Sequence, residues 1–408
     1  MGGKMSKQFI SKKNFYDSPL EDGSAVSAEL RRDCYAVFAC RHKFCRDVCP
    51  VYLEERAEGG TSYGFHSALL AVSEGHGVLS EMVDTSQLCL ECGACQLRCP
   101  NTLYTGDFYG QTTTTIDLVR KIRRDLIAQG TPPTNWENVD KYIQEDLDRE
   151  KTAGDSMVRW AEDFDLPVSG QTMMFVDYFN AFQTTDVPRS AVKILKKAGV
   201  KFGILDKPFP TLGELYESDK KLWVSFAKEN CKKLKNAGAE TVIIVNPHDY
   251  IFFTSEYPKY FKVPFDVIYV TDYIWSLYEQ GKLLFENEIN IKATYHDPCT
   301  LNKQSLSWEA PRKLISAIAG IKFDADDRVT QWDYCCGNGL NSFKRLLPDV
   351  SYKVGLKRLS LAEELEVEQL IVACPHCLDQ FTEVQTKSGS SIQPVHILDL
   401  VIKAAGIE

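Results

Sequence analysis

The chain has 408 residues, of which 44% are hydrophobic and 25% charged, and its formal net charge is −9. This length allows two or three globular domains, and the negative charge argues against nucleic acid as the main partner. No run of apolar residues is long enough to span a membrane, and the polar N-terminus lacks the apolar segment of a secretory signal. We therefore expect a cytoplasmic protein, which partner subunits could associate with a membrane.

Residues 1–130 are expected to form a domain of helices and loops. The segments GFHSALLAVSEGHG and TTTIDLVRKIRRDLIAQG have the apolar spacing of helices, and eight cysteines lie in the same region. Residues 131–168 are acidic, and we interpret them as a helical linker.

From residue 169 the pattern changes to short β-rich runs that alternate with helical stretches. The runs are QTMMFVDYF, KFGILD, TVIIVNP, FDVIYV, IKATYHDP and QLIVACP. This alternation predicts an α/β layer with largely parallel strands. Segment 240–253 resembles segment 368–381, since an apolar strand, a Pro-His pair and a trailing aromatic recur. We interpret 169–285 and 286–408 as two halves of a duplication, with chance similarity as the alternative.

Fourteen cysteines are many for a chain without an export signal. Because a reducing compartment keeps thiols free, spaced cysteines there indicate metal sites rather than disulfides. Thirteen of them fall into three groups with ligand spacing. The exception is Cys231, which stands alone in the helical pattern LWVSFAKENCKKLKN and is expected to be a buried structural thiol.

The strongest motif is the run Cys89, Cys92, Cys95 and Cys99-Pro100, whose C-x2-C-x2-C-x3-C-P spacing is that of bacterial ferredoxins with [4Fe–4S] clusters. Three closely spaced thiolates can hold one cubane, and the fourth cysteine ligates a second cluster. A structural zinc site is the alternative, although zinc ligands usually come as two separated pairs.

A second group supplies the other cluster: Cys34, Cys40, Cys45 and Cys49, the last followed by proline. Five residues separate Cys34 from Cys40 and four separate Cys40 from Cys45, where the usual motif has two residues in each interval. We assign Cys34, Cys40, Cys45 and Cys99 to one [4Fe–4S] cluster, and Cys49, Cys89, Cys92 and Cys95 to the other. A three-iron cluster at the stretched site is the alternative. Such a pair of clusters relays single electrons and makes no bonds on a substrate.

The third group is Cys299, Cys335-Cys336-Gly337 and Cys374-Pro375-His376-Cys377. Each part follows a predicted strand, so three loops should converge at one edge of a parallel sheet. Five thiols exceed what one zinc ion or one cubane needs. The group therefore predicts a centre with an additional or bridging thiolate, or a cluster with a replaceable ligand.

This third pattern resembles the cysteine-rich CCG domain of heterodisulfide reductases. With the ferredoxin motifs ahead of it, the layout is similar to that reductase's two-part catalytic subunit. It is also similar to the iron–sulfur subunits of glycolate oxidase, anaerobic glycerol-3-phosphate dehydrogenase and lactate-utilisation complexes. The resemblance implies an α-helical two-cluster ferredoxin module (1–130), a linker (131–168) and an α/β duplicated CCG-type domain with largely parallel sheets. Of its halves, 169–285 is degenerate and lacks cysteine ligands, and 286–408 holds the metal centre.

In heterodisulfide reductases the CCG cysteines hold a noncubane [4Fe–4S] cluster that cleaves a disulfide. The resemblance implies this centre, and this catalytic role, for Cys299, Cys335, Cys336, Cys374 and Cys377, with zinc as the less favoured alternative. The reductase uses two such motifs, however. Here Asn246, Asp249 and the stretch 206–208 stand where the first would be, and none offers a soft ligand. This departure weakens any expectation that the substrate is the reductase's own heterodisulfide.

No G-x-G-x-x-G motif follows a strand and no Walker loop is present, so a flavin or nicotinamide is expected on another polypeptide. We favour an electron-transfer subunit that works with a flavoprotein dehydrogenase or an electron-transferring flavoprotein, and with a quinone-linked membrane subunit as a further partner. The alternative is a reductase that cleaves a small or protein disulfide at the CCG centre. His296 and His376 could protonate a leaving thiolate there, but hydrogen bonding to backbone or cluster sulfur is the favoured role.

Overall fold

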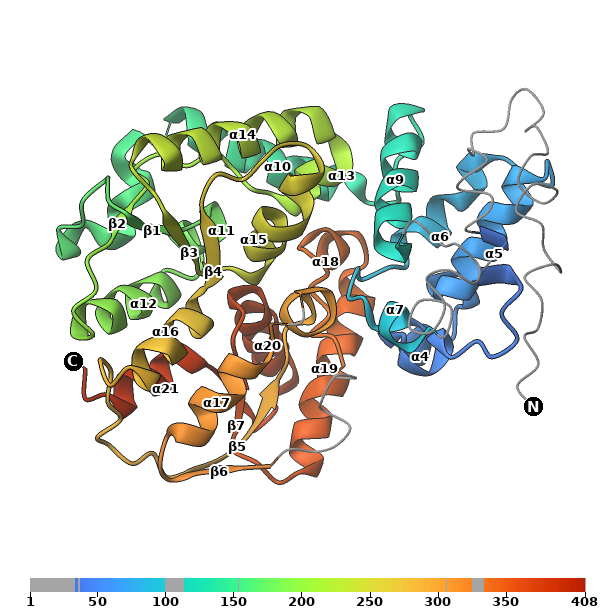
Figure 1. Cartoon of the computed structure of the whole chain (residues 1–408). Helices are drawn as coiled ribbons and strands as arrows, with labels where there is room; N and C mark the ends of the chain where they lie inside the picture. The colour runs from blue at the N-terminus through green and yellow to red at the C-terminus, as the bar shows by residue number, and fades with distance from the viewer. Residues whose placement is uncertain are drawn as a thin grey trace, which may run out of the picture. The chain divides into compact units, whose positions relative to one another are not determined.

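The computed structural model describes residues 34–35, 37–99, 114–152, 154–305, 307–324 and 334–407. Contacts divide the chain into a first unit, Met1–Thr134, and a second unit, Asn135–Glu408 (Figure 1). Within the described ranges, no helix combines the length and the apolar character that crossing a membrane requires.

The first unit is built from helices, and no strand occurs among its described residues. Its longest helices are α5 (Ser62–Ser73) and α9 (Thr115–Ala128), whose N-termini are capped by the hydroxyls of Thr61 and Thr114. Their apolar faces form one core, in which Leu69 and Ile122 are fully buried. The shorter elements are α3 (Cys45–Val48), α4 (Pro50–Glu55), α6 (Val83–Gln87), α7 (Ala94–Arg98) and the 3-10 turns Glu58–Gly60 and Leu79–Met82.

The second unit contains two four-stranded parallel sheets with equivalent strand orders, β2-β1-β3-β4 and β6-β5-β7-β8. The first sheet consists of β1 (Thr172–Phe175), β2 (Gly203–Ile204), β3 (Thr241–Ile244) and β4 (Asp266–Tyr269). The second consists of β5 (Ile291–His296), β6 (Ile321–Phe323), β7 (Gln369–Val372) and β8 (Gln393–His396). The predicted α/β architecture with two parallel halves is thereby confirmed.

Helices connect and cover these strands. In the first half they are α11 (Tyr178–Phe182), α12 (Asp186–Lys197), α13 (Gly213–Ser218), α14 (Lys220–Asn236), α15 (Pro247–Ile251), the π-helix Phe252–Glu256, the 3-10 helix Tyr257–Lys259, and α16 (Val270–Glu279). In the second half they are the π-helix Thr300–Ser305, α17 (Glu309–Ala317), α18 (Ser342–Leu346), α19 (Pro348–Glu364), α20 (Pro375–Ser388) and α21 (Ile397–Ala404). The strand expected before Cys335, at 329–334, lies almost wholly outside the described residues.

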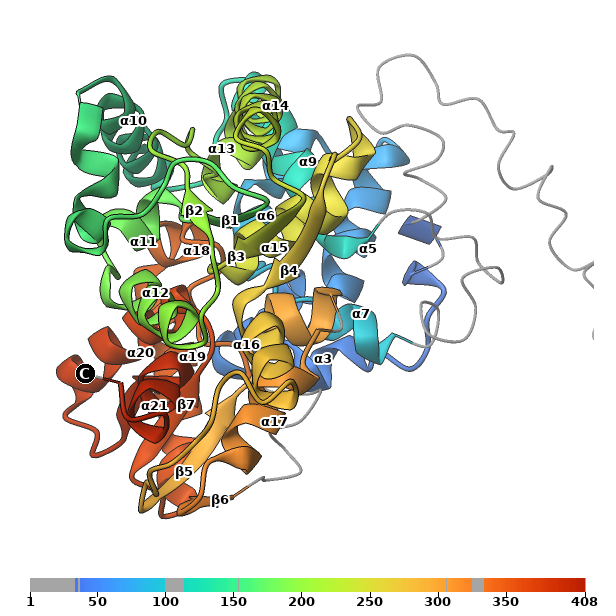
Figure 2. The same ribbon diagram turned by 60° about the vertical axis from the view of Figure 1, so that its left-hand side comes forward.

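The two halves share one apolar core, and α12 packs beside α21 (Figure 2). Leu195 and Val401 are among its fully buried side chains. The Tyr269 hydroxyl, at the end of β4, donates to the carbonyl oxygens of Val245 and Ala373, one from each half. This arrangement brings the carboxyl ends of β3 and β7 close together, and both ends carry the residues predicted to form or replace metal ligands.

The segment expected to be a linker folds onto the second unit. It forms α10 (Trp136–Thr152) and the 3-10 helix Gly154–Phe164. The side chain of Asn135 donates to the carbonyl oxygen of Leu346 at 2.9 Å, and the guanidinium of Arg345 lies 3.5 Å from the ring centroid of Tyr142. The start of this segment is therefore packed against α18. The four domain limits expected from the sequence remain a prediction.

Candidate metal centres

The ferredoxin run begins on a tight loop between α6 and α7, which carries Cys89 and Cys92, and it continues with Cys95 inside α7 and Cys99 directly after it. Glu91 and Gly93 both have positive φ, +54° and +76°, and Gly93 immediately precedes α7. A left-handed pair at this point reverses the chain within the C-x2-C-x2-C spacing, and glycine adopts such a φ without steric cost. The backbone N–H of Glu91 donates to the Sγ of Cys89 at 3.4 Å, as expected of a loop that wraps round sulfur ligands.

Four cysteines of the first unit line one cavity. They are Cys49, Cys89, Cys92 and Cys95, the four assigned from sequence to one cluster, and the cavity has about 490 Å³ of empty volume. Burial raises the pKa of the Cys89 thiol to about 12 and that of Cys95 well above its usual value. Thiolates are strongly disfavoured at such a site unless a cation compensates them, and iron ions would do so. The chemistry of the cavity therefore fits an iron–sulfur cluster.

Of the ligands expected for the other cluster, three interact with one another and the fourth lies in the apolar core. Cys45 begins α3, and burial, followed by the neighbouring Cys99 and Cys40, raises the pKa of its thiol. These three cysteines are thus close enough to interact electrostatically. Cys34 is fully buried and packs in the apolar core formed with α5 and α9. The assignment of these four residues to one cluster stays a prediction.

A buried ion-pair triad supports the ferredoxin loop and was not found by sequence reasoning. The Glu91 carboxylate accepts hydrogen bonds from Arg120 Nε at 2.6 Å and from an Arg123 Nη at 3.0 Å. Arg123 also donates to the carbonyl oxygens of Ser86 and Cys89, at 3.0 and 2.9 Å. The available signal was a pair of arginines, three residues apart, on the apolar face of the predicted 113–130 helix.

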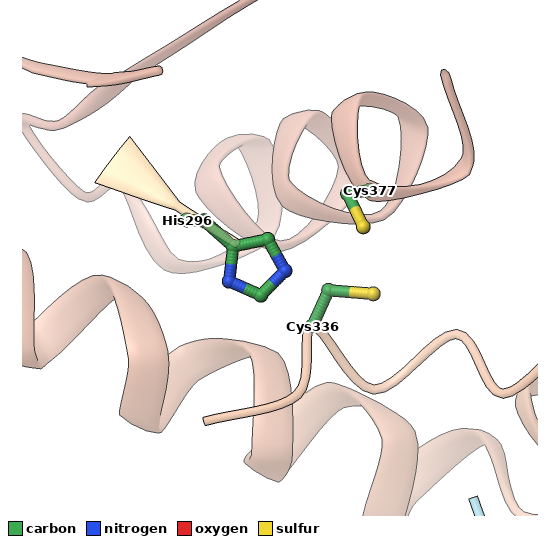
Figure 3. Close-up of side chains that lie close together, drawn as sticks. All are labelled: His296, Cys336 and Cys377. Atoms are coloured by element: carbon green, nitrogen blue, oxygen red, sulfur yellow. The ribbon is translucent and has the colours of Figure 1, made fainter. Parts of the chain in front are cut away.

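The third group converges from three loops, as its position after strands predicts. Cys299 follows β5, Cys335 and Cys336 precede α18, and Cys374 and Cys377 lie at the N-terminal end of α20. The Sγ atoms of Cys299 and Cys335 are 3.5 Å apart. Ligand atoms of His296, Cys336 and Cys377 all lie within 4.8 Å of one another (Figure 3). The structure thus gathers soft ligands at one buried point.

Hydrogen bonds among these thiols favour one thiolate. The sulfur of Cys336 accepts from Cys335 and Cys377, which lowers the pKa of Cys336 to about 6 in spite of its burial. The same contacts, together with Cys374 and burial, raise the pKa of Cys377 well above its usual value. Because the thiolate is the form that binds metal, these hydrogen bonds favour Cys336 as a metal ligand.

Gly337 allows the paired cysteines to sit tightly against α19. Its φ is +96°, and a Cβ at this position would lie 2.4 Å from the carbonyl oxygen of Ser351. The Ser351 hydroxyl in turn donates to the Gly337 carbonyl at 2.9 Å and is itself contacted by Gln380 at 3.1 Å. The loop is therefore fixed by backbone contacts that leave no room for a side chain.

Replacing Gly337 by alanine is expected to destabilise the second unit by more than about 2 kcal/mol, because backbone strain and a steric clash act together. Iron bound at this site should fall as well. Gly389→Ala is the matched control, since its φ is +71° but nothing lies within 4 Å of the added Cβ. That variant should lose only about 1–2 kcal/mol. Thermal unfolding with metal analysis measures both, and equal losses would contradict the clash.

The half without cysteine ligands, 169–285, contributes to the wall of this site. Asn246, at the position equivalent to Cys374, caps α15 and donates to Asp177 Oδ2 at 2.6 Å. Its amide also lies 3.1 Å from Nε2 of His376. The rings of Phe179 and His248 stack on His376, with centroid distances of 3.7 and 4.4 Å. Burial, and then His248, hold the pKa of His376 well below its usual value. A neutral, clamped imidazole fits the structural role favoured for His376.

Comparisons with known proteins agree with these sites. Residues 33–103 match the 4Fe-4S dicluster domain family, and residues 293–382 match the cysteine-rich domain family named CCG. The chain is 25% identical over 365 residues to one of the subunits of the dihydromethanophenazine:CoB–CoM heterodisulfide reductase of Methanosarcina mazei, covering 85% of each protein. It is 23% identical over 333 residues to the EtfAB:quinone oxidoreductase of Syntrophomonas wolfei, covering 76% of this chain and 45% of that protein.

A solved structure of a hypothetical protein from Helicobacter pylori has a TM-score of 0.53 and 10% identity, covering 90% of this chain and 72% of that one. This likeness concerns the fold alone. The predicted resemblance is confirmed by the sequence comparisons: the chain carries a 4Fe–4S dicluster domain and a CCG domain, and its homologues are iron–sulfur subunits of heterodisulfide reductases and related iron–sulfur oxidoreductases.

Proposed function

We propose that this chain is the iron–sulfur electron-transfer subunit of a larger oxidoreductase. The observation that carries the proposal is the grouping of soft ligands at separate sites, one of them the cavity lined by Cys49, Cys89, Cys92 and Cys95. Two [4Fe–4S] clusters in the first unit would relay single electrons to or from a noncubane [4Fe–4S] centre held by the CCG cysteines. The clusters would carry the electrons, and the protein would supply ligands, burial and hydrogen bonds to sulfur.

The partner we infer is a flavoprotein. Coupling one-electron centres to the oxidation of a two-electron substrate needs a cofactor such as a flavin that handles both one and two electrons, and the sequence offers no nucleotide-binding loop of its own. Similarity to an EtfAB:quinone oxidoreductase supports an electron-transferring flavoprotein on one side and a quinone-linked subunit on the other. We place this assembly in the cytoplasm, with any membrane association made through partner subunits.

Metal and sulfide analysis of the anaerobically purified full chain tests the proposal. Two cubanes and a noncubane cluster give about twelve irons per chain and no zinc. About eight irons and one zinc would make the C-terminal site structural and would overturn the three-centre relay. Fewer than about four irons would contradict the electron-transfer role itself.

Disulfide reduction is the second candidate function, and the contact between Cys299 and Cys335, with sulfurs 3.5 Å apart, favours it. A centre with five thiols can release one ligand and bind a substrate sulfur in its place. The test supplies reduced chain with small and protein disulfides and measures the thiols produced. Cys336→Ala should abolish the activity, and an unchanged rate in that variant would exclude this function.

A further inference from the structure

We propose that His296 is a ligand of the C-terminal centre and binds one of its irons through an imidazole nitrogen, beside the thiolates of Cys336 and Cys377. This inference rests on the proposed iron–sulfur centre at the CCG cysteines. It replaces an all-thiolate site by a mixed site of nitrogen and sulfur ligands.

The first support is position. His296 is the last residue of β5 and is fully buried. A ring nitrogen of His296 and the Sγ atoms of Cys336 and Cys377 lie within 4.8 Å of one another. Figure 3 shows one ring nitrogen on the side of the two sulfurs and the other directed away. Metal ions bind nitrogen and sulfur at about 2.0–2.3 Å, so one ion can reach all three ligand atoms from this arrangement.

The second support comes from the half that has no cysteine ligands. The register pairs Phe175 with Ile244 in the first sheet and His296 with Val372 in the second, so Phe175 stands at the position equivalent to His296. Phe175 packs edge-on against Phe253 with a centroid distance of 5.2 Å. His296 makes the same type of contact with Phe381 at 4.9 Å.

A phenyl ring therefore satisfies the packing at this position. Burying an imidazole in place of a phenyl costs free energy unless its nitrogens gain a polar or metal partner. The imidazole occurs in the half that retains the cysteines, and the phenyl occurs in the half that has Asn246 and Asp249 instead. The two halves share the packing at this position, but the imidazole is present in the half that has the cysteine ligands. We therefore relate the imidazole of His296 to metal binding and not to the packing of the fold.

The strand end that carries His296 is held rigidly, as a ligand position requires. The next residue, Asp297, is buried and forms an ion pair with Arg312. Arg358, which is also fully buried, donates to the carbonyl oxygen of Tyr295 at 3.0 Å. Cys299 follows two residues later, so β5 and its loop would offer a nitrogen and a sulfur ligand at short spacing, a pattern common in metal sites.

Isotope-labelled histidine tests the inference on the intact chain. The protein is prepared with ¹⁴N- or ¹⁵N-histidine, metal content is determined, and pulsed EPR is recorded with the C-terminal centre poised in its paramagnetic state. We expect a strong nitrogen hyperfine coupling, of the size produced by direct ligation, which changes with the isotope. An iron-loaded centre with no coupling, or with only the weak coupling of a hydrogen bond, would overturn the assignment.

Two variants locate the nitrogen. His296→Phe copies the residue of the other half and should fold normally, and the coupling should disappear. His376→Gln, which changes the neighbouring buried histidine, should retain it. Persistence of the coupling in His296→Phe would overturn the inference. If His296→Phe fails to assemble the centre, the inference is decided by the labelled parent protein: an isotope-dependent strong nitrogen coupling supports it, and its absence overturns it. Zinc or missing iron in the parent would instead refute the proposed function, so the two failures are distinguishable.

Discussion

Replacing Cys92 by alanine is expected to remove about one to four irons per chain, together with the EPR signal of one reduced [4Fe–4S] cluster. Cys92 shares its cavity with Cys49, Cys89 and Cys95, and burial raises the pKa of these three thiols so far that they need metal to be thiolates. A cubane with three protein ligands in such a cavity would be lost or converted to a three-iron form. Iron and sulfide analysis with EPR of the reduced protein measures the effect.

Cys231→Ala is the matched control for that experiment. Cys231 is also buried, with 4% exposure, but it lies in α14 and belongs to none of the three cysteine groups with ligand spacing. Its replacement should leave the iron content unchanged and cost about 1–2 kcal/mol of stability through a small cavity. Full iron content in Cys92→Ala, or a loss of iron in Cys231→Ala, would refute the assignment of the ferredoxin run.

Replacing Arg123 by alanine is expected to destabilise the ferredoxin loop by about 1–3 kcal/mol, because the buried carbonyl oxygens of Ser86 and Cys89 lose their donor while Glu91 keeps its ion pair with Arg120. Both side chains of the Arg123–Glu91 pair are only 1% exposed, and the atoms are 3.0 Å apart. Arg123 also holds the carbonyl of Cys89, so its loss releases the first ligand of the run. Hydrogen exchange of the amides between α6 and α7 measures this local opening.

The control for Arg123 is Lys121, which lies on the same helix. Lys121 pairs with Asp125 one turn away, but its side chain is 42% exposed. Since exposed pairs of this kind contribute about 0.3–0.5 kcal/mol, Lys121→Ala should change the exchange very little. An equal response of the two variants would show that the triad does not stabilise the loop.

Local patterns explain which parts of the fold were predicted correctly. Helix α9 was expected because its apolar residues recur with helical spacing, and β3 and β7 because short apolar runs end at a Pro-His pair. The edge strands β6 and β8 were missed. Each has only three or four residues, and β8 includes Pro394, a residue that argues against a central strand but that an edge strand tolerates.

The sequence by itself determined the chemistry of this protein, because cluster ligands within one loop follow a spacing along the chain. The run from Cys89 to Cys99 is such a case, and it identifies iron–sulfur clusters before any fold is known. The position of Cys231 in a helical pattern likewise separated it from the ligands.

Only the tertiary structure decided which distant residues share a site. Arg123 reaches Glu91 from another helix, a contact that no spacing in the sequence indicated. His296 joins Cys336 and Cys377 because three strand and helix ends of the second unit meet at one point. The physical reason is that strand order and helix packing, which set these contacts, depend on the burial of the whole core and leave no local trace in the sequence.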